Sequence, residues 1–178
     1  MNDHGSSTAT RVVREDIVAI LPRLRRFCLA LTRSPDAGDD LAQSTIERAL
    51  SRIEQWQQRT RLDSWMFTIA KNIFLDELRA TKRRGQRVDV DALDDVTGDD
   101  GRQVTEGRSD LGRARQAMAA LPVEQRALMA LVVIDGQSYK EAAAILDIPI
   151  GTVMSRLARA RRAIDGHVNG APDALASS

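Results

Sequence analysis

The chain has 178 residues and is nearly neutral, because 26 lysines and arginines face 25 aspartates and glutamates. One cysteine excludes an internal disulfide framework. The longest apolar run, residues 127–134, is far shorter than the ~18 residues of a membrane span. The polar start "MNDHGSSTAT" lacks the apolar core of a signal peptide. We therefore expect a cytoplasmic protein without membrane insertion. Scarce aromatics, glycines and prolines favour an all-α fold.

Charge is distributed unevenly along the chain. Residues 1–87 hold 16 basic and 11 acidic side chains. Residues 88–112 hold 2 basic and 8 acidic side chains, and residues 113–178 hold 8 basic and 6 acidic ones. The middle piece also has four glycines and little apolar periodicity. It is either a solvated loop within one domain or a flexible linker, and a structureless loop of this length is rare in a compact domain. We therefore predict two small helical domains joined by an acidic linker.

The first domain is expected to begin with a helix whose buried face carries Leu21, Leu24, Cys28 and Leu31. On this face Cys28 is interpreted as a packed apolar residue rather than a reactive thiol. Ser34 and Pro35 open the next helix. Its expected buried stripe is Ile46, Ala49, Leu50 and Ile53.

The other side of this second helix is polar and mostly acidic. Its members are Asp36, Asp39, Asp40, Gln43 and Glu47. Acids near a helix start stabilise it through its dipole. The same side chains could instead form a docking face for a basic protein surface. Composition leaves the two interpretations open.

A third helix is predicted in "LDSWMFTIAKNIFLDELRATKRR", with Asp63 as its cap and Leu62 and Phe67 as a hydrophobic staple. Met66, Ile69, Ala70 and Ile73 should face inward. A second face is polar and bears the residues Thr68, Asn72, Asp76, Arg79 and Arg83, with Lys71 flanking. Residues 71–87 hold six basic side chains. The pattern fits either a nucleic-acid surface or a solvated amphipathic helix.

The second domain should contain four helices. The stretch "RARQAMAALPVEQRALMALVVIDG" predicts two, with Pro122 at the start of the second. Ser138 and Glu141 form a capping box for a third, whose expected buried residues are Tyr139, Ala142, Ala143 and Leu146. Pro149 and Gly151 are expected to make the turn that follows.

The fourth helix has two distinct faces. Val153, Leu157, Ala160 and Ile164 form the apolar stripe. The opposite side carries Thr152, Ser155, Arg156 and Arg159, with Arg162 at its edge. A surface helix made soluble by arginine usually mixes both signs of charge, and this face does not. Two short helices joined by a tight turn, the second Arg-rich, favour a DNA-reading helix-turn-helix.

The chain resembles the sigma factors of the extracytoplasmic-function (ECF) type. The resemblance is carried by four motifs that match in order and spacing: "DDLAQST", "LDSWMFTIAKNIFLDELR", "LPVEQR" and "GQSYKEAAAILDIPIGTVMSRLARAR". The resemblance spans residues 16–164. It implies a non-catalytic subunit of bacterial RNA polymerase that directs promoter-specific initiation in a stress or envelope-type response. The implied organisation is a disordered N-terminus (1–13), a region 2 domain (14–87), an acidic linker (88–110), a region 4 domain (111–166) and a disordered tail (167–178).

The resemblance also implies roles for the polar faces. The acidic residues Asp36, Asp39, Asp40, Gln43 and Glu47 fall in the helix that docks on core polymerase. The minus-10 promoter element would meet Arg61, Thr68, Lys71, Asn72, Asp76, Arg79 and Arg83. The minus-35 element would meet Thr152, Ser155, Arg156, Arg159 and Arg162. The loop "QWQQRTR" captures a flipped base in this family, and the family's linker threads towards the RNA exit path.

Core RNA polymerase, promoter DNA and an anti-sigma factor are the expected partners. We expect neither a cofactor nor a metal, since His4, His167 and Cys28 form no ligand cluster. Gly38 departs from the family's larger residues and is expected to weaken its helix slightly. The alternative is a dimeric helix-turn-helix regulator that acts without being a polymerase subunit. Dependence of promoter binding on core polymerase separates the two.

Overall fold

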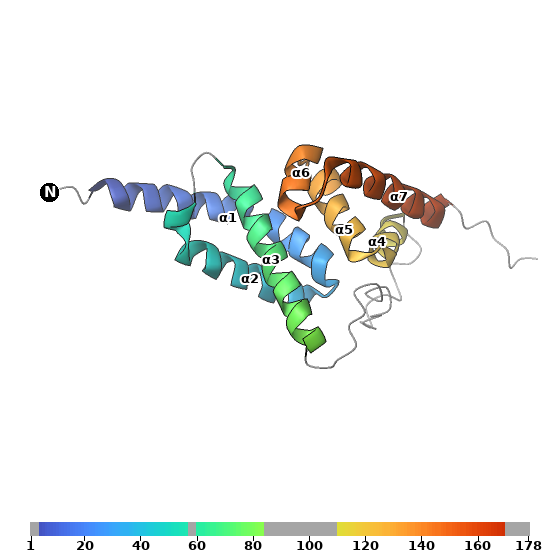
Figure 1. Ribbon diagram of the computed structural model, residues 1–178, viewed down its shortest axis with the longest axis horizontal. Helices are drawn as coiled ribbons and strands as arrows, with labels where there is room; N and C mark the ends of the chain where they lie inside the picture. The colour runs from blue at the N-terminus through green and yellow to red at the C-terminus, as the bar shows by residue number, and fades with distance from the viewer. Residues whose placement is uncertain (1–3, 57–59, 84–109, 170–178) are drawn as a thin grey trace, which may run out of the picture. The chain divides into compact units, whose positions relative to one another are not determined.

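The computed structural model describes residues 4–56, 60–83 and 110–169, and its regular structure is helical throughout these ranges (Figure 1). The expected all-α fold is thus confirmed. The chain divides into two compact units, residues 1–80 and 81–178. The predicted linker, except for Asp110 at its end, lies outside the described residues.

The first unit consists of α1 (His4–Thr32), α2 (Pro35–Ser51), the short 3-10 helix η1 (Ile53–Gln55) and α3 (Leu62–Arg83). α1 begins at His4, within the stretch 1–13 that is expected to be disordered, and the boundary at residue 13 stays a prediction. Beyond Gly5 no helix-breaking residue stands before Pro22.

The core of the first unit lies between α1 and its two neighbours. Leu24, Cys28 and Leu31 are buried on α1 as predicted, while Leu21 is half-buried. Burial raises the pKa of the Cys28 thiol to about 12, with a smaller contribution from the charge of Asp39, so Cys28 is a packed residue and not a thiolate. Phe27 of α1 meets Phe67 of α3 edge to face, with ring centroids 5.1 Å apart.

Of the stripe predicted for α2, only Ala49 is buried. Its buried residues are Gly38, Leu41, Ala42, Thr45 and Ala49. Ile46 is only half-buried and Leu50 is 42 % exposed. The hydroxyl of Thr45 donates to the carbonyl of Leu41 at 2.7 Å, which satisfies a polar group inside the core. The prediction weighted large apolar side chains, whereas α2 packs mainly through small ones.

Gly38 explains why small residues are used. A Cβ atom at this position would stand 3.2 Å from the Cα and the backbone nitrogen of Leu29, and 3.3 Å from the hydroxyl of Thr32. The backbone of α1 therefore occupies the space that a side chain would need. Gly38 is a close-approach residue between α1 and α2, and it is not merely a weak point of its helix.

The second unit comprises α4 (Asp110–Ala120), α5 (Val123–Leu128), the π-helix η2 (Met129–Ile134), α6 (Tyr139–Leu146) and α7 (Ile150–Asn169). α4, α5 and α6 all contact α7, the red helix of Figure 1. Val153, Leu157 and Ala160 are almost fully buried along α7, and Ile164 is half-buried. α7 runs to Asn169, past the expected domain end at residue 166, and residues 170–178 are not described.

The predicted capping box of α6 is confirmed. The Ser138 hydroxyl accepts from the N–H of Glu141 at 3.2 Å, and the Glu141 carboxylate accepts from the N–H of Ser138 at 2.8 Å. The fully buried residues of α6 are Ala142 and Ile145, while Tyr139, Ala143 and Leu146 are half-buried. Of the four residues predicted to be buried, Ala142 is confirmed and the other three are only half-buried.

The turn between α6 and α7 differs from expectation in its residues. The left-handed conformation belongs to Asp147, with φ of 56°. Aspartate tolerates this region because its short polar side chain can bond locally. Gly151 already lies within α7, where a Cβ would meet nothing within 4 Å. Pro149 directly precedes α7, and its carbonyl accepts from the N–H of Thr152 at 2.9 Å.

Candidate nucleic-acid and protein interfaces

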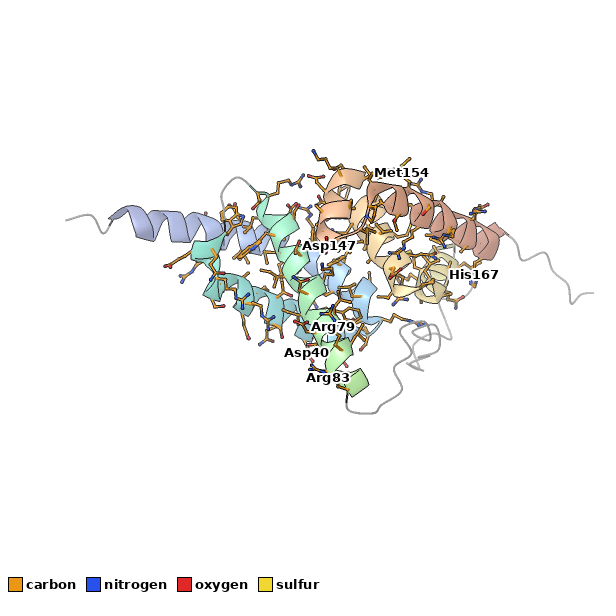
Figure 2. All side chains as sticks on the ribbon, viewed as in Figure 1. Asp40, Arg79, Arg83, Asp147, Met154 and His167 are labelled. Carbon is orange, nitrogen blue, oxygen red and sulfur yellow. The ribbon has the colours of Figure 1, made fainter. Side chains whose placement is uncertain are left out.

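The acidic face of α2 is fully available to solvent within its unit. Asp36, Asp39, Asp40, Gln43 and Glu47 are all exposed (Figure 2 labels Asp40). Gln43 donates to Glu47 at 3.0 Å, one helical turn apart. Thus every acid predicted for protein docking lies on one accessible helix surface, opposite the small residues that pack on α1.

Asp39 differs from its neighbours because it has a basic partner. Arg25 of α1 holds it in two hydrogen bonds, Nε–Oδ1 at 2.8 Å and Nη2–Oδ2 at 2.6 Å. These bonds lower the pKa of the Asp39 carboxyl and raise the pKa of Arg25. The negative charge of Asp39 is therefore shared with Arg25, and Asp40 carries more of the face's unshielded charge.

The polar face predicted on α3 is present. Asn72, Asp76, Arg79 and Arg83 are exposed, while Thr68 and Lys71 are half-buried. Arg79 pairs with Asp76 at 3.1 Å. The Thr68 hydroxyl donates to the carbonyl of Ser64 at 2.9 Å, so its oxygen is partly engaged by its own helix. The face thus presents the amide of Asn72 and the cations of Lys71, Arg79 and Arg83. Such side chains are suited to contact the backbone and the base edges of a nucleic acid.

The start of α3 is held by a buried carboxylate. α3 begins at Leu62, so Asp63 lies inside the first turn rather than capping it, and its side chain is 6 % exposed. Arg23 of α1 donates to Asp63 at 2.8 Å, and Arg61 donates to both carboxylate oxygens at 3.1 and 2.7 Å. Burial alone raises the pKa of Asp63. Hydrogen bonds from Arg61, the Ser64 N–H and Arg23 outweigh that effect and lower the pKa to about 2.

The described residues on either side of positions 57–59 have hydrogen-bond partners. Trp56 donates its indole N–H to the carbonyl of Thr60 at 3.1 Å, across residues 57–59, which are not described. Arg61, predicted to contact DNA, has its guanidinium on Asp63. Arg61 therefore acts here as an anchor of the segment, although its side chain remains 57 % exposed.

The face predicted to read duplex DNA lies along α7. Ser155, Arg159 and Arg162 are exposed and Thr152 is half-buried. The Nε atoms of Arg159 and Arg162 lie within 3.5 and 3.4 Å of carbonyls one turn earlier in the same helix. The one acid of α7, Asp165, follows Ile164, so residues 150–164 carry four arginines and no acidic side chain.

Arg156 is placed differently from its predicted position on the outward face. Its side chain is only 24 % exposed, and its Nη2 lies 2.5 Å from a carboxylate oxygen of Glu124 in α5. The spacing of residues along α7 alone predicted an outward position for Arg156, because it carries no information about neighbouring helices. α5 packs beside this flank of α7 and supplies the partner.

Sequence reasoning overlooked three features of these surfaces. Glu124 and Arg23 went unnoticed because their partners are 32 and 40 residues away. Ile150 and Met154 were not considered, although they are 51 % and 56 % exposed near the start of α7. Their i,i+4 spacing on a helix with a separate buried stripe was a signal available in the sequence.

Within the described part of the chain, no three His, Cys, Asp or Glu side chains gather as metal ligands would. None of the helices described is both long and apolar enough to cross a bilayer. An open hollow of about 520 Å³ in the second unit is lined by Met129, Arg161, Arg162, Ile164, Asp165 and Val168. It holds no constellation of catalytic type.

Known proteins resemble the chain over both units. The family model "Sigma-70, region 4" matches residues 111–164, and "Sigma2 domain of PhyR" matches residues 17–71. ECF RNA polymerase sigma factor EcfG of Rhodopseudomonas palustris is 35 % identical over 166 residues, which are 92 % of this chain and 90 % of that protein. The ECF sigma-E factor of Escherichia coli is 32 % identical over 149 residues, 78 % of each chain.

A solved structure is similar as well. The sigma factor RpoE of Bartonella quintana, solved in complex with the anti-sigma factor NepR, aligns with a TM-score of 0.73 and 29 % identity. The alignment covers 89 % of this chain and 98 % of that one.

Proposed function

Because this chain belongs to the extracytoplasmic-function type of RNA polymerase sigma factors, we propose that it binds bacterial core RNA polymerase and directs it to specific promoters. The observation that carries the proposal is 35 % identity to such a factor over 92 % of the chain. Members of this family are regulatory subunits, so the chain would itself catalyse no reaction. Its work would take place in the cytoplasm, with the polymerase and the chromosome.

Three surfaces divide the work in this proposal. The acidic face of α2 docks on core polymerase, with Asp36, Asp40 and Glu47 supplying charge beside the Arg25–Asp39 pair. The polar face of α3 and the anchored segment before it contact the minus-10 element through Arg61, Thr68, Lys71, Asn72, Asp76, Arg79 and Arg83. α7 contacts the minus-35 element through Thr152, Ser155, Arg159 and Arg162, with Arg156 reaching DNA from its place beside Glu124.

An anti-sigma factor is the proposed regulator, since the similar structure from Bartonella quintana holds one. Such a partner would keep the chain from core polymerase until a stress or envelope-type signal releases it. Copurification from cells before and after stress, with an affinity tag on this chain, would show one small protein leaving the complex as polymerase enters it.

Run-off transcription tests the central proposal. Purified core polymerase, this chain and sheared genomic fragments should together give discrete transcripts that core polymerase alone does not make. Dimeric binding of the chain to an operator, with no transcript and no dependence on core, would instead establish the helix-turn-helix regulator.

A charge reversal tests the docking face separately. Asp40 is exposed and stands beyond the first turn of α2, where the helix dipole has little influence. Asp40→Lys should therefore weaken capture of core polymerase about tenfold or more, while circular dichroism stays unchanged. Glu15→Lys is the matched control, because Glu15 is an exposed acid on α1, outside this face. Equal loss in both variants would show a general charge effect instead of docking by α2.

A further inference from the structure

Two large apolar side chains are exposed at the beginning of α7. Ile150 is 51 % and Met154 is 56 % exposed, although α7 already has a buried stripe in Val153, Leu157 and Ala160 (Met154 is labelled in Figure 2). Residues four apart on a helix are neighbours, so Ile150 and Met154 form one continuous apolar surface. No described residue of the second unit covers this surface as fully as the buried stripe is covered.

The chemistry around this pair indicates what covers it. Ser155, next to Met154, is exposed, and Arg159 follows about one turn later. The helix up to Ile164 has four arginines and no acid. A partner that meets this side of α7 must therefore combine strong negative charge with some apolar surface. A protein helix with an apolar face would supply the second property but needs a run of acids for the first.

Duplex DNA has both properties in its major groove. Phosphates line the groove, and each thymine presents its C5-methyl group on the groove edge. Recognition helices place their N-terminal residues against base edges, which is where Ile150 and Met154 lie on α7. We infer that Ile150 and Met154 read thymine methyl groups in the duplex element that α7 contacts, and so set part of the promoter specificity.

This inference rests on the proposed function, and its test separates the two. The reconstituted holoenzyme is first used to select binding duplexes from a randomised minus-35 pool. Each thymine of a selected duplex is then replaced singly by deoxyuridine, which removes only the C5-methyl group. Failure to select any duplex contradicts the sigma-factor proposal itself. If duplexes are selected, contact with the thymine methyl groups is then measured on those duplexes.

For the wild-type holoenzyme, replacing at least one thymine by deoxyuridine should weaken binding about fourfold, the size expected from one buried methyl group. Met154→Ala or Ile150→Ala should abolish that difference, so thymine and deoxyuridine duplexes bind equally. Met154→Leu should keep it, because leucine is also a long apolar side chain. Val133→Ala is the control: Val133 is 50 % exposed on η2 and should leave the difference unchanged.

Two results would overturn the inference. In the first, no single deoxyuridine weakens binding, or the weakening persists in both alanine variants. In the second, Met154→Ala lowers capture of core polymerase in the absence of DNA, which would identify the apolar pair as a protein contact.

Discussion

At the scale of single residues, Gly38 shows how one position can have opposite effects in a helix and in a fold. Glycine to alanine in an isolated helix gains ~1 kcal/mol. Here the new Cβ would press on the backbone of Leu29 at 3.2 Å, and backbone atoms of a packed helix cannot swing aside as a side-chain end can. We predict that Gly38→Ala lowers the free energy of unfolding of the first unit by ~1 kcal/mol or more.

Tryptophan fluorescence measures this effect selectively, because both tryptophans, Trp56 and Trp65, belong to the first unit. Gly166→Ala in α7 is the matched control, since a Cβ there meets nothing within 4 Å. It should raise the melting temperature seen by circular dichroism. Stabilisation of the first unit by Gly38→Ala would mean that α1 moves away at little cost.

Asp63 is the residue that couples folding of the first unit to acid. Its pKa is lowered to about 2 in the folded chain, against ~3.9 in an unfolded one. As the pH falls, the unfolded chain takes up its proton first, so the stabilisation is present above pH ~4 and is lost towards pH 2. We predict that denaturant titrations by tryptophan fluorescence show this loss in the wild type.

Asp63→Asn should be less stable at neutral pH by about 1–3 kcal/mol, because Arg23 and Arg61 lose a charged acceptor. Between pH ~4 and pH ~2 the free energy of unfolding of this variant should also fall less than that of the wild type, because the contribution of Asp63 is missing. Asp76→Asn serves as control, since Asp76 is an exposed carboxylate on the same helix. A wild-type acid profile in the Asp63 variant would assign the pH dependence to other carboxylates.

At the scale of elements, the contact between α5 and α7 decides what Arg156 does. The Arg156 guanidinium lies 2.5 Å from Glu124 and the Arg156 side chain is 24 % exposed, whereas Arg159, about one turn later, is exposed. We predict that Arg159→Ala costs ~1–3 kcal/mol on the preferred minus-35 duplex and relaxes one base preference. Arg156→Ala should weaken consensus and scrambled duplexes alike, and should lower the stability of the second unit by up to ~1 kcal/mol.

Duplex titrations at two salt concentrations distinguish base contacts from phosphate contacts. A double-mutant cycle between Arg156→Ala and Glu124→Ala then measures their coupling by thermal unfolding. A different result would contradict this prediction: Arg156→Ala loses a base preference while Arg159→Ala binds DNA like the wild type. Arg156 would then contact a base, as its spacing along α7 alone suggested.

At the scale of the whole molecule, the acidic side chains of residues 88–112 offset the net positive charge of the residues before and after them. Asp89, Asp91, Asp94, Asp95, Asp99 and Asp100 lie outside the described residues, so their role stays a sequence-based prediction. A simple tether kept extended by its charge is one possibility. The family resemblance favours the other, in which the segment occupies the RNA exit path of the polymerase and imitates the charge of RNA.

We predict that changing all six to asparagine leaves the helical content unchanged, raises core-free DNA binding at low salt, and alters the yield of short abortive transcripts. Both effects are electrostatic and should diminish as salt shortens the Debye length below ~8 Å. Circular dichroism, DNA titration at two salt concentrations and a short-transcript assay check the three parts. Wild-type behaviour in the last two would establish a passive tether.

The amino-acid sequence by itself determined the helical class, most helix positions, the α6 capping box and the polar faces of α2, α3 and α7. These features depend on local periodicity and on contacts within a few residues. Only the tertiary structure decided the rest: the close approach at Gly38, the shared carboxylate of Asp63, and the pairing of Arg156 with Glu124. Each of these joins residues distant in the chain, and a helical wheel contains no information about the neighbouring helix that turns an outward position into a contact.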